Sequence, residues 1–321
     1  MKLIKLLKNW TLPVSMFLGI SGYLLFAYVP IFSGVAHVFT PICEAFLPFF
    51  MSIILYITFC KVDFRKLIPT KWHVIVSVIH SLTVFSIVGF CLLFRLSGNT
   101  LILTEATLAC IIAPTAAASA IVTQKLGGSL EEMTTYTFLS NLLCAVLIPL
   151  VFPLIEPSLS VDFISASLSI LYRVGAVLLL PMALAYFTKH MRALHKFYLW
   201  LTSIKNLAFY FWAILLMFVT GTTVKNIMHS ETTLSLLLLI AFSGLVVCIF
   251  QFAVGRYAGR FFHHQVEAGQ ALGQKNTSFA LWIAGAYLHP LATVGPGCYI
   301  LWQNIVNSIE IWHYERHTPT K

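Results

Sequence analysis

The sequence is poor in charged residues. Only 10% of its 321 residues are Asp, Glu, Lys or Arg, whereas 59% are hydrophobic and the mean hydropathy is +0.88. Soluble domains carry roughly 25% charged residues, so this chain has too few to cover a surface that faces water. The composition excludes a soluble enzyme, a disordered hub and a nucleic-acid-binding domain. The expected surroundings of the protein are a lipid bilayer.

The sequence also lacks paired cysteines and clusters of metal ligands. Its seven cysteines stand singly inside apolar stretches, without a CxxC pair, and their number is odd. Isolated cysteines of this kind behave as small buried apolar residues. The eleven histidines show no metal-ligand spacing. We therefore predict a protein without a metal site or a cofactor.

What the sequence has in abundance is long apolar runs. A bilayer core requires about 20 apolar residues per helix, and the uncharged stretches accommodate ten such helices with short connections. Barrel strands would instead alternate over about 10 residues, so we predict an all-α polytopic membrane protein. The predicted spans are 10–32, 42–60, 72–94, 102–124, 132–154, 165–187, 198–220, 233–255, 267–288 and 292–313.

The positive charges predict how these spans are oriented. With the N-terminus in the cytoplasm, fifteen of the twenty Lys and Arg residues fall in inner segments, and only Arg95 and Lys225 fall in outer loops. Cytoplasmic loops are typically rich in Lys and Arg, so we expect both termini to be cytoplasmic. The net charge of +9 then reflects orientation rather than affinity for nucleic acid. The expected setting is a bacterial inner membrane, with the protein a monomer or a weak oligomer.

Two of the predicted spans are expected to be interrupted. In the fourth, Pro114 removes a backbone donor, and small residues follow it at 115–120. In the ninth, residues 273–278 bring a lysine, amides and hydroxyls to mid-span, which lipid tolerates only around a cavity. The alternatives are a packed proline kink in the fourth span and a loop between two short helices in the ninth.

The two interruptions lie about half the chain length apart. Two sets of five helices, each with a broken fourth member, are typical of secondary transporters built from inverted repeats. In such folds the free N–H groups of the half-helices face an anionic substrate near the midplane. On this basis we divide the single membrane domain into a first repeat, 1–158, and a second repeat, 159–321.

These segments resemble those of the bile acid:sodium symporter family and its wider relatives. The stretch 114–128 is similar to the family's Pro-Gly-Gly-Thr-Ala-Ser-Asn crossover in the fourth helix, and Gly273 and Asn276 match its ninth-helix pattern. The last span matches at His289-Pro290-Leu291, Pro296-Gly297 and Trp302-Gln303-Asn304. The resemblance implies alternating access, in which a core of helices 3–5 and 8–10 moves against a panel of helices 1–2 and 6–7.

The resemblance also implies sodium sites near both crossovers, but several of the ligands are replaced. Ser119 and Thr137 are retained, and Ser81 matches a further ligand. Where the family has an asparagine, a serine, a glutamate and a glutamine, this chain has Ala120, Met133, Ala271 and Lys275. Because hard cations need oxygen ligands and an ammonium group repels sodium, we predict transport without sodium coupling, with Lys275 in place of the ion.

Two polar groups within the spans are candidates for proton coupling. Lys275 could hold the crossover together as a fixed cation, or it could gain and lose a proton, since burial disfavours a charged form. His80 lies mid-span beside Ser81. It could relay protons, or it could make an ordinary interhelical hydrogen bond.

By resemblance, the substrate is a small organic anion. A bile acid, a keto acid or a pantoate-like molecule would each fit an electropositive crossover. Arg173 in the sixth span could attract an anion or extend toward the outer interface, and Lys205 is expected to anchor the seventh span at the inner interface. The predicted substrate contacts are Ala117, Ala118, Asn276, Thr277, Gln303 and Asn304.

Other functions remain as alternatives. A sodium-dependent bile-acid-type symporter, an efflux carrier or uniporter, and a channel or receptor-like protein could each be built on this fold. A membrane-embedded enzyme would need a catalytic cluster at one depth. The sequence offers no carboxylate clearly at mid-span, because Glu44, Glu105 and Glu310 lie near predicted helix ends.

Overall fold

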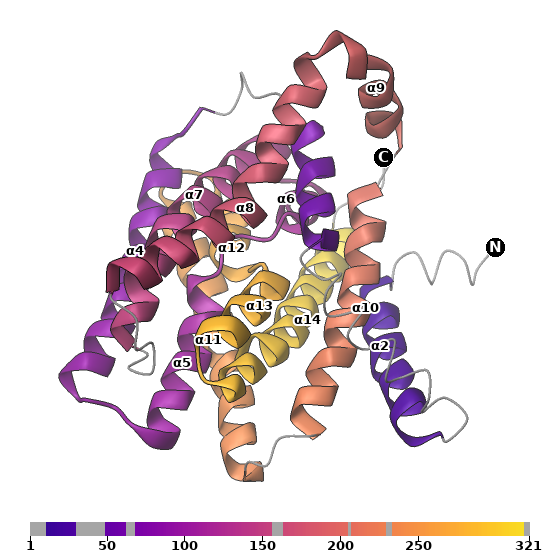
Figure 1. The fold of residues 1–321 in the computed structure, drawn as a ribbon. Helices are drawn as coiled ribbons and strands as arrows, with labels where there is room; N and C mark the ends of the chain where they lie inside the picture. The colour runs from indigo at the N-terminus through magenta and orange to yellow at the C-terminus, as the bar shows by residue number, and fades with distance from the viewer. Residues whose placement is uncertain are drawn as a thin grey trace.

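The protein is described here by a computed structural model covering residues 11–29, 49–61, 68–155, 163–204, 207–228 and 233–317. The regular secondary structure in these ranges is helical, which confirms the predicted all-α class (Figure 1). One further helix occupies Phe49–Cys60. The labelled α-helices are α2 (Thr11–Tyr28), α4 (Lys71–Leu93), α5 (Gly98–Ile112), α6 (Ala118–Lys125), α7 (Leu130–Ile155), α8 (Phe163–His190), α9 (His195–Ser203), α10 (Leu207–Met228), α11 (Leu234–Arg260), α12 (Gln265–Gly273), α13 (Thr277–Tyr287) and α14 (Val294–His317).

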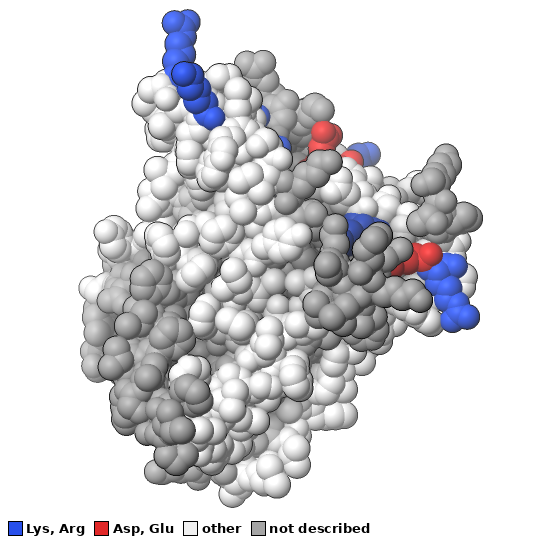
Figure 2. Space-filling model, turned by 90° about the vertical axis from the view of Figure 1, so that its right-hand side faces the viewer, with Lys and Arg blue, Asp and Glu red and all other residues white. Residues whose placement is uncertain are grey.

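The surface of the molecule suits a bilayer. In the described part of the chain, α4, α7 and α11 are long and apolar enough to cross a membrane. Leu82, Val146 and Leu238, one on each of these helices, are 60%, 56% and 60% exposed. On the face shown in Figure 2, the charged side chains lie in the upper part of the view and along its right-hand side, and the described residues of its lowest part are uncharged. A membrane protein requires this arrangement, because its apolar surface contacts lipid and its charged end contacts water.

Glycines on α11 allow α12 to pack directly against it. A Cβ atom at Gly255 would lie 2.2 Å from the carbonyl oxygen of Ala268, and one at Gly259 would lie 2.3 Å from that of His264. The two glycines are four residues apart and so share one face of the helix. Small residues at this spacing let membrane helices approach to backbone contact. This contact positions α12, the first half of an interrupted helix.

The predicted spans agree with the helices over most of the described chain, but the seventh is wrong. The third, fifth and eighth spans are confirmed by α4, α7 and α11, whereas the span predicted at 198–220 falls on two helices, α9 and α10. Lys225, predicted in an outer loop, lies in the last turn of α10. Polar residues at 202–203 and 205–206 interrupt the apolar run at this point, and the predicted span extends across them.

The end of α9 depends on a contact from elsewhere in the chain. The backbone leaves the helix at Ile204, which is extended with φ −77° and ψ 109°. The Lys61 ammonium, 143 residues earlier, donates a hydrogen bond of 2.8 Å to the Ile204 carbonyl. A cation at a helix C-terminus satisfies a free carbonyl and opposes the negative end of the dipole. Sequence proximity could not have indicated this pair.

Both predicted interruptions are confirmed. The fourth span divides into α5, which ends at Ile112, and α6, which begins at Ala118. The ninth divides into α12, which ends at Gly273, and α13, which begins at Thr277. Cys43, Glu44 and Lys205 lie outside the described residues, and the other six cysteines are buried and free.

Candidate functional site

The two interruptions cross each other and pair through their backbones. Thr115 and Lys275 form an isolated antiparallel β-bridge. Beside it, the Ala116 N–H donates to the Gln274 carbonyl at 2.9 Å, and the Asn276 N–H donates to the Pro114 carbonyl at 2.8 Å. Unwound backbone at membrane depth must find partners inside the protein. Here each unwound segment supplies the other's partners, and we call this paired region the crossing.

Side chains satisfy the carbonyls at the ends of the half-helices. The Thr115 hydroxyl donates to the Ala271 carbonyl at 2.7 Å, and the Tyr299 hydroxyl donates to the Gly273 carbonyl at 2.7 Å. Helix C-termini leave carbonyls without intrahelical partners. These two bonds therefore give two carbonyls at the C-terminal end of α12 partners from other parts of the chain.

The helix that follows each interruption supports the crossing in a matching way. Ser140 of α7 accepts a hydrogen bond from the Thr115 N–H at 3.0 Å. Gln303 of α14 accepts from the Lys275 N–H at 2.9 Å and donates to the Lys275 carbonyl at 3.2 Å. Gln303, predicted to contact substrate, thus holds the backbone of Lys275 instead of lining the pocket.

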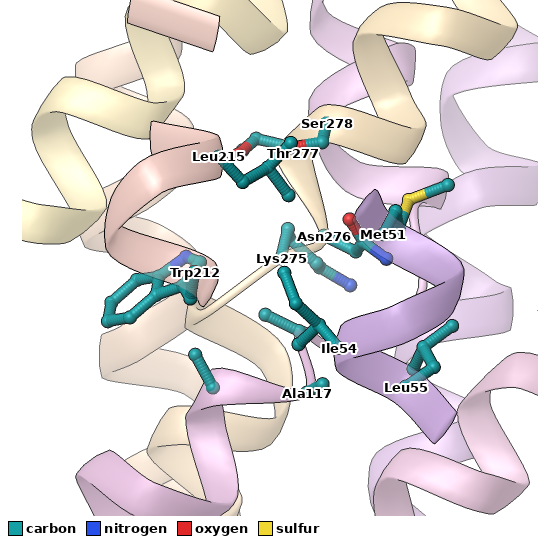
Figure 3. A pocket seen from close by; sticks show the side chains of 12 residues that line it. Met51, Ile54, Leu55, Ala117, Trp212, Leu215, Lys275, Asn276, Thr277 and Ser278 are labelled. Atoms are coloured by element: carbon teal, nitrogen blue, oxygen red, sulfur yellow. The ribbon is translucent and has the colours of Figure 1, made fainter. Parts of the chain in front are cut away.

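A pocket adjoins the crossing (Figure 3). One wall comes from the two interrupted segments and the other from the Phe49–Cys60 helix and α10. Ala117, Ala118, Asn276 and Thr277, four predicted substrate contacts, are among the lining residues. The remaining lining residues are Met51, Ile54, Leu55, Ala116, Trp212, Leu215, Lys275 and Ser278.

The two walls of the pocket differ in character. The crossing wall carries the N-termini of α6 and α13, whose dipoles present partial positive charge, together with Lys275. Asn276 caps α13 by accepting a hydrogen bond from the Phe279 N–H at 3.2 Å. The opposite wall is mostly apolar, with Met51, Ile54 and Trp212. Such a pocket suits a molecule that has both an anionic group and an apolar part.

Lys275 is the charged group at the centre of the crossing. Its side chain is 1% exposed, and within the described structure its Nζ atom has no hydrogen-bond partner. The ammonium interacts electrostatically with His80 of α4 and Cys144 of α7. A buried cation without a partner is strongly disfavoured, so this lysine has to be compensated by an anion or by loss of its proton.

His80 is similarly buried, at 2% exposure. Its ring lies near the Ile111 carbonyl, but neither ring nitrogen makes a hydrogen bond within ordinary distance and angle limits. The alternative of an interhelical hydrogen bond, to Ile111 of α5, stays open beside that of a proton relay. His80 and Lys275 are brought to the same region, as expected for groups that act together.

The remaining predicted site residues bond within their own segments. The Ser81 hydroxyl donates to Ser77, and that of Thr137 donates to Met133. The Ser119 hydroxyl donates to Ala116, and the Asn304 amide donates to Ile300. Each acceptor is a backbone carbonyl three or four residues earlier, so these side chains do not join the pairing of the crossing.

Sequence analysis missed a buried carboxylate. Glu105, placed near a helix end, is 0% exposed within α5 and accepts a hydrogen bond of 3.0 Å from the His289 N–H. This bond holds the turn that follows α13. Its hydrogen-bond partner, His289, lies 184 residues away in the sequence, so no local pattern around Glu105 could have indicated this contact. Arg173 lies in α8, as its predicted span implied.

A helical membrane protein in which two interrupted helices cross beside a polar pocket belongs to the class of membrane transporters. The sequence model of the sodium bile acid symporter family matches residues 48–230, more than half of the chain. The chain belongs to this family, and it is therefore an integral membrane transporter rather than an enzyme. No curated protein matches the chain.

The family match ends before the second interruption. Residues 48–230 include Thr115 and Ser140 but not Lys275 or Gln303. The more polar half of the crossing thus lies in the part of the chain that the match does not include.

Proposed function

We propose that this protein is a secondary active transporter that moves a small organic anion by alternating access and without sodium coupling. Lys275 is the observation that carries the proposal. A buried ammonium without a hydrogen-bond partner adjoins the pocket, at the position where the family resemblance implies a sodium ligand. In this proposal the lysine supplies the positive charge that sodium would otherwise bring.

The proposed architecture is ten membrane spans in two inverted repeats, 1–158 and 159–321, with both termini in the cytoplasm of a bacterium. The core comprises α4–α7 and α11–α14, and the panel includes the Phe49–Cys60 helix and α10. The position of the pocket supports this division, because its walls come from the crossing on one side and from those two panel helices on the other. Motion of the core against the panel would open the pocket to each side of the membrane in turn.

The chemistry of the pocket supports an anionic substrate. Two half-helix N-termini and Lys275 make one wall electropositive, and helix N-termini bind carboxylate and phosphate groups through free N–H groups. Apolar side chains on the opposite wall would contact the rest of the molecule. A small carboxylate with a hydrocarbon portion has both features.

The first experiment measures uptake into proteoliposomes with taurocholate, pyruvate and pantoate as probes. Sodium and proton gradients are imposed separately across the same vesicles. We expect at least one probe to accumulate in a proton gradient, or to exchange across the membrane, at a rate that does not depend on sodium. A strict sodium requirement would contradict the role given to Lys275.

Variants test the lysine directly. Lys275→Ala is expected to lower gradient-driven uptake by about tenfold or more, because an intramembrane charge at a coupling site is essential to it. Lys125→Ala, at an exposed lysine in the last turn of α6, is the matched control and should leave uptake intact. The double variant Ala271→Glu with Lys275→Gln restores the two family ligands and should confer sodium stimulation. Unchanged uptake and pH profile in Lys275→Ala would exclude a titrating role.

A further inference from the structure

A file of polar side chains lies between α4 and α7. His73, Ser77 and His80 occupy positions i, i+4 and i+7 of α4, which places them on one face of the helix. On α7, Glu132, Tyr136 and Ser140 follow with a spacing of four residues, and α4 packs against α7. We call His73, Ser77, His80, Glu132 and Tyr136 the α4–α7 file. It begins near the helix starts and ends close to Lys275.

The first end of the file is accessible to water. The His264 Nε2 atom lies 3.4 Å from a Glu132 carboxylate oxygen, and the two side chains are 28% and 30% exposed. The His264 Nδ1 atom lies 3.8 Å from a carboxylate oxygen of Glu267 on α12. A histidine between two carboxylates can take up a proton from solvent and pass it on.

His73 packs behind this entrance and fixes the ring of Tyr136. Its Nδ1 atom accepts a hydrogen bond from the Thr70 N–H at 2.8 Å, so Nε2 carries the proton and donates to the Glu132 carbonyl at 2.9 Å. The ring stacks on Tyr136 with centroids 6.1 Å apart. Tyr136 also stacks on Trp72, at 5.6 Å. The tyrosine is thereby held at a defined position behind the entrance.

The inner part of the file consists of buried polar atoms without partners. The Tyr136 hydroxyl is 0% exposed and faces the Ser77 side chain without a well-formed hydrogen bond. Both His80 ring nitrogens and the Lys275 Nζ atom also lack partners in the described structure. Buried polar atoms are nearly always paired, with protein or with ordered water. Unpaired atoms in succession therefore mark positions where water bridges neighbouring side chains.

We propose that the α4–α7 file carries protons between the charged end of the molecule and Lys275. Lys275 takes up a proton through the pocket while the pocket is open to the outer side. After the anion has left on the inner side, that proton passes His80, Ser77 and Tyr136 to Glu132 and His264 and reaches water at the charged end. This inference rests on the proposed function, and it names the proton as the coupling ion. The anion binds and exchanges on protonated Lys275, and only the return of the empty carrier requires the proton to leave.

Other titratable groups flank the file without belonging to it. Cys144 of α7 interacts with Lys275, but its thiol donates to the Ile112 carbonyl at 3.1 Å. Glu267 of α12 faces His264 at the entrance and accepts from the Ser129 N–H at 2.7 Å. Toward the other end of α4, Cys91 interacts with Glu105 of α5. These contacts leave Lys275 and His80 as the acceptor groups at the inner end of the file.

Tyr136→Phe is the decisive variant, because it removes one hydroxyl and keeps the ring that stacks on Trp72. Uptake of a probe anion driven by a proton gradient should fall by about tenfold or more, since a phenyl ring neither donates nor accepts a proton. Counterflow of the same probe, which moves no net protons, should proceed at the wild-type rate. Tyr257→Phe, at a tyrosine that is 65% exposed on α11, is the control and should change neither.

Two results of this experiment would overturn the proposal. Gradient-driven uptake at the wild-type rate in Tyr136→Phe would show that protons do not need the file. Equal loss of uptake and counterflow, in both Tyr136→Phe and the smaller change Ser77→Ala, would assign the file a structural role alone. The second variant guards against a folding defect particular to the tyrosine.

A measurement without substrate separates this proposal from the proposed function. In protein labelled with ¹⁵N-histidine and held in lipid nanodiscs, the His80 resonance is assigned by its loss in His80→Gln. Proton exchange between this ring and water should slow by about tenfold or more in Tyr136→Phe. Equal exchange rates in wild type and variant would overturn the file. If no probe crosses the wild-type membrane but exchange slows as expected, the proposed function fails while the file stands.

Discussion

The two interrupted helices share a backbone arrangement and differ in side-chain chemistry. In both, one N–H of the unwound segment is bound by a side chain from the following helix: Thr115 by Ser140 and Lys275 by Gln303. Yet residues 113–117 are small, whereas residues 274–276 are Gln, Lys and Asn. The first segment therefore forms its half of the crossing with one polar side chain, that of Thr115. The polar side chains of the other segment indicate that the second interruption carries the chemistry.

The N-termini of α6 and α13 also differ in side-chain chemistry. Asn276 caps α13 through its side chain, whereas Ala117, at the start of α6, offers no side-chain acceptor and has helical backbone angles of φ −58° and ψ −30°. A carboxylate bound near α6 would meet N–H groups without competition from a capping side chain. The first interruption thus presents backbone to the pocket, and the second presents side chains.

The largest effect should come from removing the support of the second interruption. Gln303→Leu would leave the N–H of buried Lys275 unpaired and remove one of two hydrogen bonds to its carbonyl, which keeps the bond from the Thr277 N–H. The expected cost is about 2–4 kcal/mol in the free energy of unfolding. Ser140→Ala, its counterpart in the first interruption, leaves only the Thr115 N–H unpaired and should cost about 1–2 kcal/mol. Thermal unfolding in detergent measures both. Equal losses in the free energy of unfolding would mean that the two interruptions depend to the same extent on the side chains of Ser140 and Gln303.

A smaller difference is expected between the bridged residues themselves. Thr115→Val should lower the free energy of unfolding by about 1–3 kcal/mol, because the buried Ala271 carbonyl loses its hydroxyl donor. Lys275→Met removes an unpaired buried cation and should leave stability unchanged or raise it. The same unfolding experiment compares the two. A large destabilisation by Lys275→Met would show that the lysine is a structural tether, contrary to the proposed function.

The smallest effect concerns the caps. Asn276→Ala should destabilise the protein by about 1 kcal/mol, the usual cost of losing a capping side chain. Ala117→Ser, which offers α6 an acceptor it lacks, should be neutral or slightly stabilising in the same assay. If Asn276→Ala left stability unchanged but lowered probe uptake, the Asn276 side chain would act in substrate binding rather than in capping α13.

Local composition was enough to predict part of the fold and part of the site. Apolar runs located α4, α7 and α11, and Pro114 together with the polar residues at 273–278 located the two interruptions. The roles of Gln303 and Glu105 could not be predicted, because their partners lie 28 and 184 residues away. The boundary between α9 and α10 was missed although polar residues at 202–203 and 205–206 mark it, because the predicted span at 198–220 extends across them.

The sequence by itself determined the medium, the helical class and the two interruptions, because hydropathy, charge and proline act within a few residues of chain. Only the tertiary structure decided that Thr115 and Lys275 pair, that Gln303 holds backbone rather than lining the pocket, and that His80 is buried in the same region as Lys275. Those facts depend on which helices pack together. Packing is settled by contacts between residues far apart in the chain, such as the close approach of Gly255 to Ala268.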